Sequence, residues 1–499
     1  MLITENLELH AKEQPDKIYT LHNGEAWTYA EFFKKAKNIA AYFQAKGYKK
    51  GDIIALYSLN SDHFLACYYG IQLGGFSVMP VNTKLAAPEV EYIFNHSEAR
   101  GLIYDIRLDD TFQQISYEFE DVVTIGASEG LEQIYAYDTL EFQPIKIEAE
   151  EVAAVMYTSG TTGKPKGVML THSNLKYTAK IWSESMNLKE YDRMHVSTPL
   201  FHCAASHVFV VPVTYMGGSI AIEEAFSPSK TLQSLQDTKA TIFFGVPAMY
   251  SIILNLPNIN TLDLPNLRLF GYGAAPMPYE LVKKLKETFP NVGVQNLYGQ
   301  TENSPAATSL KDHLALKKIG SVGAPLPYTE VKVVDEFGEE LPIGEVGEIV
   351  VKGPQVMKGY LKNKDATERT IIDGWLYSGD LGRFDKDDLL YIVDRKKDMI
   401  NRGGENVYPV EVEEVLYQIP EILEAAVVGI LDEVYGEVPK AFIVIKEGMQ
   451  ITAQDVITYC EKNMAKYKVP YEIELLDELP RNASGKVLKH TMRTLNEVR

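Results

Sequence analysis

The sequence predicts an α/β protein with a large N-terminal domain of parallel αβα sheets, a small β-barrel and a small α+β domain at the C-terminus. Short apolar, β-rich runs alternate with helical patterns through roughly the first 320 residues, which is typical of βαβ units and parallel sheets. From about Gly320, Gly and Pro become frequent and the apolar runs shorten, which favours the antiparallel barrel. With 499 residues, 45% of them hydrophobic, the chain is also too long for one ordinary core.

The N-terminal elements follow from local patterns. Thr28–Glu31 has the form of a capping box, apolar residues then recur on one helical face from Phe32 to Phe43, and Gly47 ends the helix. The runs predicted to be strands are Ile53–Leu59, Val78–Val81, Val152–Tyr157, Ser219–Ile222, Thr241–Gly245, Leu267–Tyr272 and Val294–Leu297.

The C-terminal region has a different texture. Apolar residues alternate in Glu345–Val351, and a charged segment, Asp394–Asp398, follows a predicted strand at Leu389–Val393. We place the domain boundary there, so that residues 1–394 form the large domain and residues 395–499 the small one. The small domain is predicted to contain a helix at Glu411–Gln418 and strands at Ala425–Gly429 and Ala441–Ile445.

Composition excludes several classes of function. The net charge of −19 argues against bulk nucleic-acid binding. Three widely spaced cysteines argue against a disulfide framework or a zinc site and fit a reducing compartment. The start of the chain lacks the features of a signal peptide, and no stretch approaches ~20 uninterrupted apolar residues. We therefore expect a soluble, cytoplasmic protein without a membrane span, and leave a homodimer open.

The run Tyr157–Gly167 carries most chemical information. It contains three glycines, four Ser or Thr hydroxyls and two lysines, directly after an apolar strand. Glycines let backbone N–H groups converge on an anion, and the hydroxyls and lysines add donors and positive charge. The run therefore suits a polyphosphate, although it does not fit the Walker pattern. The alternative is a flexible linker, which the preceding strand and the lysine pair disfavour.

Four other short motifs are each ambiguous alone. Gly271–Pro276 suits a flat adenine ring but also a tight turn, and Tyr298–Glu302 suits phosphate and Mg²⁺ but also a helix start. Tyr377–Asp380 could hold a ribose diol or be an Asx-type turn. Pro480–Lys486 places a lysine on a polar loop, where it could equally be a solvated tail residue.

Together and in this order, the motifs resemble those of the adenylate-forming superfamily, which contains acyl-CoA synthetases, firefly-type luciferases and peptide-synthetase adenylation domains. The resemblance covers nearly the whole chain. It implies a two-step reaction with ATP, Mg²⁺ and CoA. A carboxylate attacks the α-phosphate of ATP, giving an acyl-adenylate and pyrophosphate, and a thiol then displaces AMP.

For the nucleotide, the resemblance assigns Thr301 to the α-phosphate, Glu302 with Thr158 to Mg²⁺, and Tyr298 to the nucleotide site. Lys486 would bridge the substrate carboxylate and the α-phosphate. The β- and γ-phosphates would be held by Thr158, Ser159, Gly160, Thr161, Thr162, Gly163, Lys164 and Lys166. The adenine would lie against Gly273, Ala274 and Ala275, and the ribose would be held by Asp380 and Arg395.

For CoA, the resemblance implies that the small domain rotates between the two half-reactions. Lys397 would be the hinge, and Gly403 and Gly404 would line the pantetheine tunnel. A plain β-turn at the two glycines is the alternative. We expect the enzyme to act on free CoA, because no carrier-protein segment follows in this sequence.

The acid is the least constrained partner. His202 stands where amino-acid-activating relatives usually carry an Asp, which favours an acyl-CoA synthetase with His202 as a gate to the acyl pocket. The small residues Cys203–Ser206 would leave depth for an alkyl chain, so we favour a medium- or long-chain fatty acid. An aryl acid, such as a benzoate or cinnamate type, remains an alternative, as do a packed role for His202, a luciferase-like oxygenase and a non-catalytic sensor.

Overall fold

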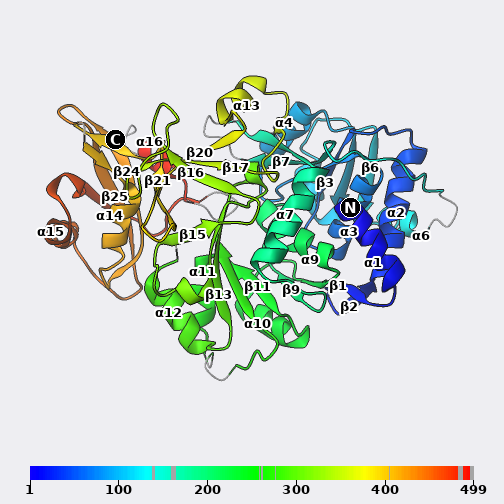
Figure 1. The fold of residues 1–499 in the computed structure, drawn as a ribbon, viewed down its shortest axis with the longest axis horizontal. Coiled ribbons are helices and arrows are strands. Elements are labelled where there is room, and N and C mark those ends of the chain that lie inside the picture. Colours follow the sequence, from blue (N-terminus) through cyan, green and yellow to red (C-terminus); the bar gives the residue numbers. More distant parts are fainter. Residues whose placement is uncertain are drawn as a thin grey trace. The chain divides into compact units, whose positions relative to one another are not determined.

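The structure is a computed structural model that describes residues 1–136, 141–158, 164–257, 259, 262–275, 277–403, 405–481 and 487–494. The chain forms two compact units. The first comprises Met1–Val331 and Val351–Tyr377, and the second comprises Lys332–Val350 and Ser378–Arg499. Figure 1 shows the elements along the chain. Each unit is described by itself.

One sheet of the first unit has seven strands in the order β18-β8-β7-β4-β3-β5-β6. The pairs from β7 to β6 are parallel, whereas β8 pairs antiparallel with both β7 and β18. This confirms the predicted, largely parallel arrangement. The strands are β3 (Ile53–Tyr57), β4 (Ser77–Pro80), β5 (Gly101–Asp105), β6 (Asp121–Ile125), β7 (Val152–Thr158), β8 (Lys166–Thr171) and β18 (Gly359–Tyr360).

A second sheet of this unit runs β15-β14-β13-β12-β11-β9-β10-β1-β2. Its central pairs, from β13 to β1, are parallel, and antiparallel strands flank them. The strands are β1 (Ile18–His22), β2 (Glu25–Thr28), β9 (Arg193–Val196), β10 (Ser219–Ile222), β11 (Ile242–Gly245), β12 (Leu269–Gly273), β13 (Gly293–Tyr298), β14 (Thr308–Leu310) and β15 (Ser321–Pro325). A short strand β19 (Ile371–Ile372) pairs with the start of β20 (Trp375–Phe384).

Helices cover the sheets and lie between them. Helix α3 (Asp62–Leu73) contacts β1 of one sheet and β3 and β4 of the other. Every residue of α3 except His63 is buried, as expected for a helix that is apolar on all sides. The predicted capping box at Thr28 is present and starts α2. The other principal helices are α1 (Ile3–Glu13), α2 (Tyr29–Ala45), α4 (Ala87–Ser97), α7 (His172–Ser185), α8 (Cys203–Ala205), α9 (Val211–Met216), α10 (Pro228–Asp237), α11 (Pro247–Leu254), α12 (Tyr279–Thr288) and α13 (Lys364–Thr370).

The second unit is α+β, as predicted. Alternate residues of β24 enter different cores, because successive side chains of a strand point to opposite faces. Ala425 and Val427 pack with α14 and α15, whereas Ala426 and Val428 pack near Met492 of α16. Its elements are β22 (Ile400–Arg402), β23 (Glu405–Val407), α14 (Pro409–Leu416), β24 (Ile422–Asp432), β25 (Gly436–Ile445), α15 (Ala453–Asn463), β26 (Glu472–Leu475) and α16 (Lys489–Thr494).

The prediction of a small β-barrel was wrong. The strands β16 (Glu330–Val334), β17 (Gly347–Lys352), β20 (Trp375–Phe384) and β21 (Leu390–Arg395) follow one another in an open order. Within the described residues, no pairing joins β21 back to β16, so these strands do not close on themselves. Short antiparallel strands separated by Gly and Pro look alike in an open sheet and a barrel. The predicted domain boundary at 394/395 stays a prediction.

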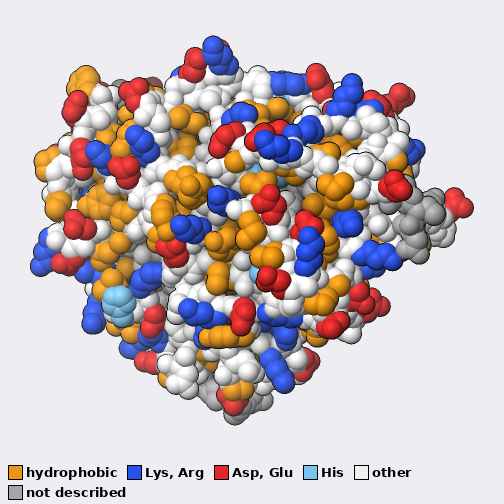
Figure 2. Space-filling view, turned by 45° about the vertical axis from the view of Figure 1, so that its right-hand side comes forward, with side chains coloured by type: hydrophobic (Ala, Val, Ile, Leu, Met, Phe, Trp, Pro, Cys, Tyr) orange, Lys and Arg blue, Asp and Glu red, His pale blue; other side chains and the backbone are white. Residues whose placement is uncertain are grey.

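The surface carries side chains of both charge signs. On the face drawn in Figure 2, Lys and Arg side chains are interspersed with Asp and Glu. Among the helices of the described part of the chain, none is long and apolar enough to cross a bilayer.

Candidate active site

The phosphate loop starts and ends on two paired strands. Thr158 is the last residue of β7 and lies opposite Lys166, the first residue of β8. The loop therefore leaves and re-enters the sheet at the end of neighbouring strands, where open α/β sheets bind ligands. Five of the predicted phosphate contacts lie outside the described residues: Ser159, Gly160, Thr161, Thr162 and Gly163.

Lys166 and Glu302 both contact the side chain of Tyr360. Its ammonium lies 4.4 Å from the ring centroid of Tyr360, and the Tyr360 hydroxyl donates to Glu302 Oε1 at 2.9 Å. The backbone of Glu302 is held as well, because Met357 N donates to its carbonyl at 2.8 Å. Burial, and then the neighbouring Glu302 carboxylate, raises the pKa of Tyr360. The phenol therefore stays protonated and keeps donating to Glu302 at neutral pH.

Thr301 stands beside Glu302 in a short 3-10 helix (Thr301–Asn303). Its Oγ1 lies 3.1 Å from Cys203 Sγ. Burial raises the pKa of the Cys203 thiol to about 12, so the sulfur remains a protonated thiol, able to donate to the threonine. The predicted α-phosphate residue is thus held from a helix 98 positions away in sequence.

His202 comes immediately before this helix. It is exposed, precedes α8 as its N-cap residue, and its ring centroid lies 6.1 Å from that of Phe201. The next residues run through α8 into the π-helical turn Ser206–Val210. π-Helical turns are rare and frequent at functional sites.

The predicted adenine segment, Gly271–Pro276, begins within β12 and continues past its end at Gly273. A Cβ on Gly273 would lie 2.4 Å from Leu297 O, so only glycine fits beside β13. Ala274 follows in the left-handed region, with φ of 65°, which costs of order 1–3 kcal/mol for a non-glycine residue. Ala274 and Ala275 are exposed, and Tyr298 ends the adjacent strand β13. Strain of this kind is typical of binding segments.

The predicted ribose pair lies in the second unit. Asp380 and Arg395 are direct partners across β20 and β21, and Arg395 Nε lies 2.8 Å from Asp380 Oδ1. Asp380 is 3% exposed, so the guanidinium fixes a nearly buried carboxylate. Lys397 lies in the turn after β21 and is exposed.

The predicted CoA and carboxylate residues are only partly described. Gly403 has a φ of 60°, which favours glycine, and its N–H donates to Tyr435 O at 2.7 Å. Gly404 and Lys486 lie outside the described residues.

Two residues that position the site belong to none of the predicted nucleotide motifs. Tyr360 and Cys203 hold Glu302 and Thr301, yet they lie 58 and 98 positions from them in sequence. Tyr360 reaches Glu302 because β18 pairs with β8, and nothing local to Gly359-Tyr360 indicates that pairing. The signal in the sequence is the small thiol directly after His202, whose size alone predicts only space for the acid.

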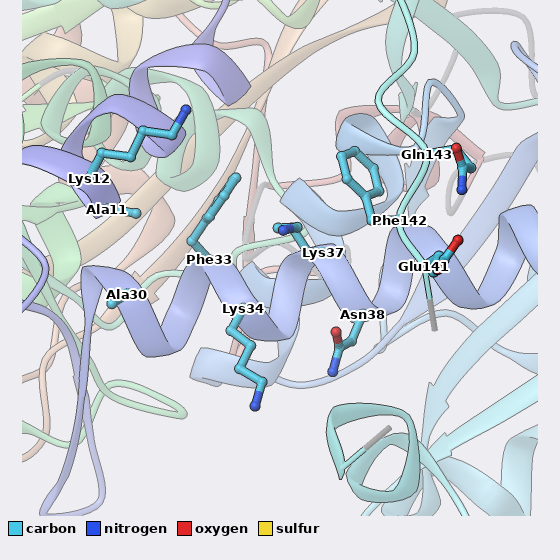
Figure 3. A pocket seen from close by; sticks show the side chains of 10 residues that line it. All are labelled: Ala11, Lys12, Ala30, Phe33, Lys34, Lys37, Asn38, Glu141, Phe142 and Gln143. Atoms are coloured by element: carbon cyan, nitrogen blue, oxygen red, sulfur yellow. The ribbon is translucent and has the colours of Figure 1, made fainter. Parts of the chain in front are cut away.

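A cavity of about 560 Å³ lies away from these residues, between α1, α2 and residues 141–143. Figure 3 shows Lys37 between two aromatic rings, with its ammonium 5.9 Å from Phe33 and 5.8 Å from Phe142. None of the predicted site residues that the structure describes lines it, so we do not assign it to the active site.

Comparison with known proteins identifies the family. Residues 7–361 match the model for the AMP-binding enzyme, and residues 411–486 match that for the AMP-binding enzyme C-terminal domain. The feruloyl-CoA synthase of an Amycolatopsis species is 35% identical over 97% of this chain and 96% of its own. The long-chain-fatty-acid–CoA ligase FadD13 of Mycobacterium tuberculosis is 34% identical over 93% of this chain and 92% of its own.

Solved structures agree. The o-succinylbenzoate CoA synthetase MenE of Bacillus subtilis, in complex with its acyl-adenylate intermediate, superposes with a TM-score of 0.88 at 31% identity, over 98% of this chain and 97% of its own. The same synthetase in complex with ATP and magnesium ion also matches with a TM-score of 0.88.

The chain belongs to the AMP-binding enzyme family. Within that family it is an AMP-forming acid–thiol ligase of the acyl-CoA synthetase class.

Proposed function

We propose that this enzyme activates a medium- or long-chain fatty acid with ATP and transfers the acyl group to CoA. The observation that carries the choice of acid is that one short helical segment has Cys203, which contacts Thr301, at its start and Phe209, which lies in an apolar wall, near its end. Cys203 contacts Thr301, and the helix that begins at Cys203 leads to Phe209, whose ring lies 4.8 Å from that of Phe244.

The wall is closely packed and apolar. A Cβ on Gly271 would lie 3.2 Å from Leu297, 3.4 Å from Phe209 and 3.5 Å from Phe244, so glycine lets these side chains meet. All three are at least 92% buried. A site that recognises a phenol or a second carboxylate needs a buried polar partner for it. This wall offers hydrocarbon, which suits an alkyl chain.

Ala204 and Ala205 differ in a way that refines the pocket. Ala205 is fully buried, whereas Ala204 is half-buried. Ala204 is therefore the residue of the small-residue run whose side chain can meet a substrate. His202, exposed immediately before it, is assigned as the gate.

In the first half-reaction, a carboxylate oxygen forms a bond to the α-phosphorus of ATP, and the bond from that phosphorus to the bridging oxygen breaks to release pyrophosphate. Thr301 donates its hydroxyl to the α-phosphate, and Cys203 holds Thr301 in place. Lys486 cancels the repulsion between the two anions that must meet. The phosphate loop, Thr158 to Lys166, holds the leaving group.

In the second half-reaction, the thiol of CoA loses its proton to solvent and its sulfur forms a bond to the acyl carbon, while the bond from that carbon to the AMP oxygen breaks. Asp380 and Arg395 hold the ribose, the segment Gly273–Ala275 lies against the adenine, and Tyr298 contributes to the nucleotide site. Lys397 is assigned as the hinge about which the small domain rotates between the two half-reactions. Gly403 and Gly404 are assigned to the lining of the pantetheine tunnel.

The donor set fits Mg²⁺. Within the described residues, no group of three or more His, Cys, Asp or Glu side chains could form a metal cage. Mg²⁺ is usually held by one or two carboxylates, waters and substrate phosphates, so Glu302 with Thr158 suits an ion that arrives with ATP. Tyr360 donates to Oε1 of Glu302, and within the described part of the chain no side chain is bonded to Oε2, which we assign to the ion. When bound, Mg²⁺ neutralises charge on the phosphates.

An aryl acid is the second candidate. The observation that favours it is the pair of rings, Phe209 and Phe244, which could stack on a substrate ring. Relatives at nearly equal identity also include both a feruloyl-CoA synthase and a fatty-acid ligase.

Pyrophosphate release separates the two candidates. The enzyme is supplied with ATP, Mg²⁺ and one acid at a time, from C4 to C18 saturated acids, benzoate and cinnamate, with and without CoA. Fatty acids are expected to give the highest kcat/KM, with thioester formed only when CoA is present. Turnover of aryl acids alone would reject the fatty-acid assignment. The cytoplasmic location and the homodimer stay predictions.

A further inference from the structure

The turn that contains the predicted hinge, Lys397, is flanked by two aspartates. Asp394 precedes the turn and Asp398 lies within it, and the two residues are only 3% and 8% exposed. The amides of Asp398 and Met399 both donate to Arg395 O, at 2.8 and 3.1 Å, so hydrogen bonds close the turn. The turn and the partners of both aspartates lie in the second compact unit. Because a buried carboxylate needs a partner, these partners determine how freely the turn moves.

Helix α16 presents two cations to this turn. Arg493 Nη2 donates to Asp398 Oδ1 at 2.8 Å. Lys489 Nζ lies 2.8 Å from Glu413 Oε1 of α14, and these two side chains are only 18% and 15% exposed. Burial would lower the pKa of Lys489, but the charge of Glu413, followed by those of Asp394 and Asp398, raises it above its usual range. Residues i and i+4 lie on one face of a helix, so Lys489 and Arg493 face the turn together.

The carboxylates that Lys489 neutralises also hold α14 in place. Asp394 Oδ2 accepts a hydrogen bond from Val410 N in the first turn of α14, at 3.1 Å. A carboxylate there pairs with an amide that the helix leaves free, and the helix dipole stabilises its charge. Glu413 Oε1 accepts from Val427 N at 2.7 Å as well as from Lys489. Lys489 thus joins α16 to α14, and Asp394 joins α14 to β21.

The contacts of Asp394 cross the hinge in sequence. Asp394 precedes Lys397, whereas Val410 and Lys489 follow it. Rotation of the small domain about Lys397 moves α14 and α16 relative to Asp394, so we expect the bond to Val410 N to break and the attraction of Lys489 to weaken. The pair that Arg493 forms lies wholly after the hinge and moves with the small domain. The Asp394 contacts therefore belong to one of the two positions of that domain.

Helix α16 also begins close to Lys486 in sequence. Arg481 and Val487 pair as an antiparallel bridge, so the two ends of the segment that contains Lys486 are joined. Lys489 follows that bridge by two residues. Its ion pair with Glu413 therefore fixes the base of the Lys486 segment to α14.

From the buried ion pair, the contacts across the hinge and the joined base of the Lys486 segment, we infer that Lys489 is a positioning residue for the ligase reaction. Lys489 stabilises the small domain in the position in which Asp394 caps α14. Its charge therefore sets the balance between the two half-reactions, since each of them uses one position. This role rests on the two half-reactions and the hinge of the proposed function, and it does not depend on which acid the enzyme takes.

The test times the two half-reactions separately in single turnovers. Adenylate formation is measured with ATP, Mg²⁺ and an acid, and thioester formation with supplied acyl-adenylate and CoA. Lys489→Gln keeps an N–H donor for Glu413 but removes the charge. One rate is expected to fall relative to the other, so that their ratio changes at least about fivefold. Lys489→Arg restores the charge and is expected to restore the wild-type ratio.

Lys440→Gln is the matched control. Lys440 is a lysine of 1% exposure with its ammonium 2.9 Å from Glu472 and 2.8 Å from Glu474, and all three residues follow the hinge. Its loss should lower the free energy of unfolding and change the ratio of the two rates by less than about twofold. An equal loss of both rates in Lys489→Gln would mean a merely structural role and would overturn the inference. So would the same change of ratio in Lys440→Gln.

Asp394→Asn is the second variant if Lys489→Gln folds poorly. It removes the opposite charge and keeps the size of the side chain. It is expected to change the ratio of the two rates in the same direction as Lys489→Gln, because both variants weaken the same attraction across the hinge. An unchanged ratio in both variants would contradict the inference.

A further measurement needs no turnover. Trypsin cleaves after lysine, and Lys397 is exposed in the turn. Without ligands, Lys489→Gln is expected to raise the rate of cleavage after Lys396 and Lys397 at least about threefold, and Lys440→Gln to leave it unchanged. Cleavage as slow as in the wild type would reject the role of Lys489 and leave the proposed ligation standing. Faster cleavage in an enzyme that releases no pyrophosphate with any acid would reject the proposed function and leave the restraint on the turn.

Discussion

The residues that carry the proposed chemistry are held by partners distant in sequence. Glu302 has its carboxylate fixed by Tyr360 and its carbonyl by Met357, and Thr301 is fixed by Cys203. A carboxylate that accepts a hydrogen bond from a fixed donor presents its oxygens in a defined direction. That orientation is what a positioned metal ligand needs.

Tyr360→Phe removes one hydroxyl and tests whether Tyr360 positions the Glu302 carboxylate. The ring remains beneath Lys166, but Glu302 loses its donor, and hydrogen bonds to charged groups contribute about 1.5–3 kcal/mol. The KM for Mg-ATP is therefore expected to rise roughly 10- to 100-fold, with little change in the KM for the acid. Initial rates at varied ATP and varied Mg²⁺ would show it.

Tyr104→Phe is the matched control, because the Tyr104 hydroxyl also donates to a carboxylate, Asp109 at 3.0 Å, outside the site. It should leave the KM for Mg-ATP as it is. An unchanged Mg²⁺ requirement in Tyr360→Phe would show that the phenol does not position Glu302.

The motif residues could be predicted from the sequence, but the residues that hold them could not. Runs such as Tyr157–Gly167 are recognisable because their composition is unusual within a few positions. Nothing in the sequence around Tyr360 marks it as a site residue. It reaches the site because the two-residue strand β18 pairs with β8, and pairing of that kind has no local sequence signature.

At the scale of elements, most strands lie where the apolar runs predict them. The runs Val152–Tyr157 and Ser219–Ile222 become β7 and β10 within one residue. The barrel was wrong because the pattern of a strand specifies its length and its faces but not its partner. Closure depends on which edges pair, and only the whole sheet decides that.

The helix that begins after His202 carries the prediction about chain length. Ala204→Phe is expected to shorten the preferred acid, because each excluded methylene loses about 0.8 kcal/mol of burial. A few methylenes should shift kcat/KM between long and short acids by ~10²-fold, with the KM for ATP nearly constant. The assay is kcat/KM over saturated acids from C4 to C18.

Ala205→Phe serves as the control for that variant. Ala205 is fully buried, so a phenyl ring there overpacks the core and should cost roughly 1–3 kcal/mol of stability while lowering activity on all acids alike. A chain-length profile that Ala204→Phe leaves unaltered would remove Ala204 from the pocket.

For the whole molecule, buried histidines make stability depend on pH. Burial lowers the pKa of His172 to about 4 and that of His207 to about 3. Between pH 6.5 and those values, the unfolded chain binds protons that the folded chain does not, so stability falls as the pH falls. Each histidine should contribute a slope of about 1.4 kcal/mol per pH unit in this window.

Urea unfolding from pH 7 to pH 4.5 measures that slope, with the double variant His172→Gln/His207→Gln as the reference. The variant is expected to be less stable at pH 7 and to show a slope smaller by up to about 2.7 kcal/mol per pH unit. Equal slopes in the two proteins would mean that both histidines are protonated in the folded state.

The central claim is that a carboxylate attacks the α-phosphate of ATP, and an oxygen label follows that bond directly. Acid labelled with ¹⁸O in both carboxylate oxygens is turned over with ATP, Mg²⁺ and CoA, and AMP is analysed by mass spectrometry. The oxygen that joins the acyl group to AMP leaves with AMP when CoA attacks, so one ¹⁸O per AMP is expected. Unlabelled AMP with the label in pyrophosphate, or ADP with the label in inorganic phosphate, would mean that the acid attacks the β- or the γ-phosphate and would contradict the account.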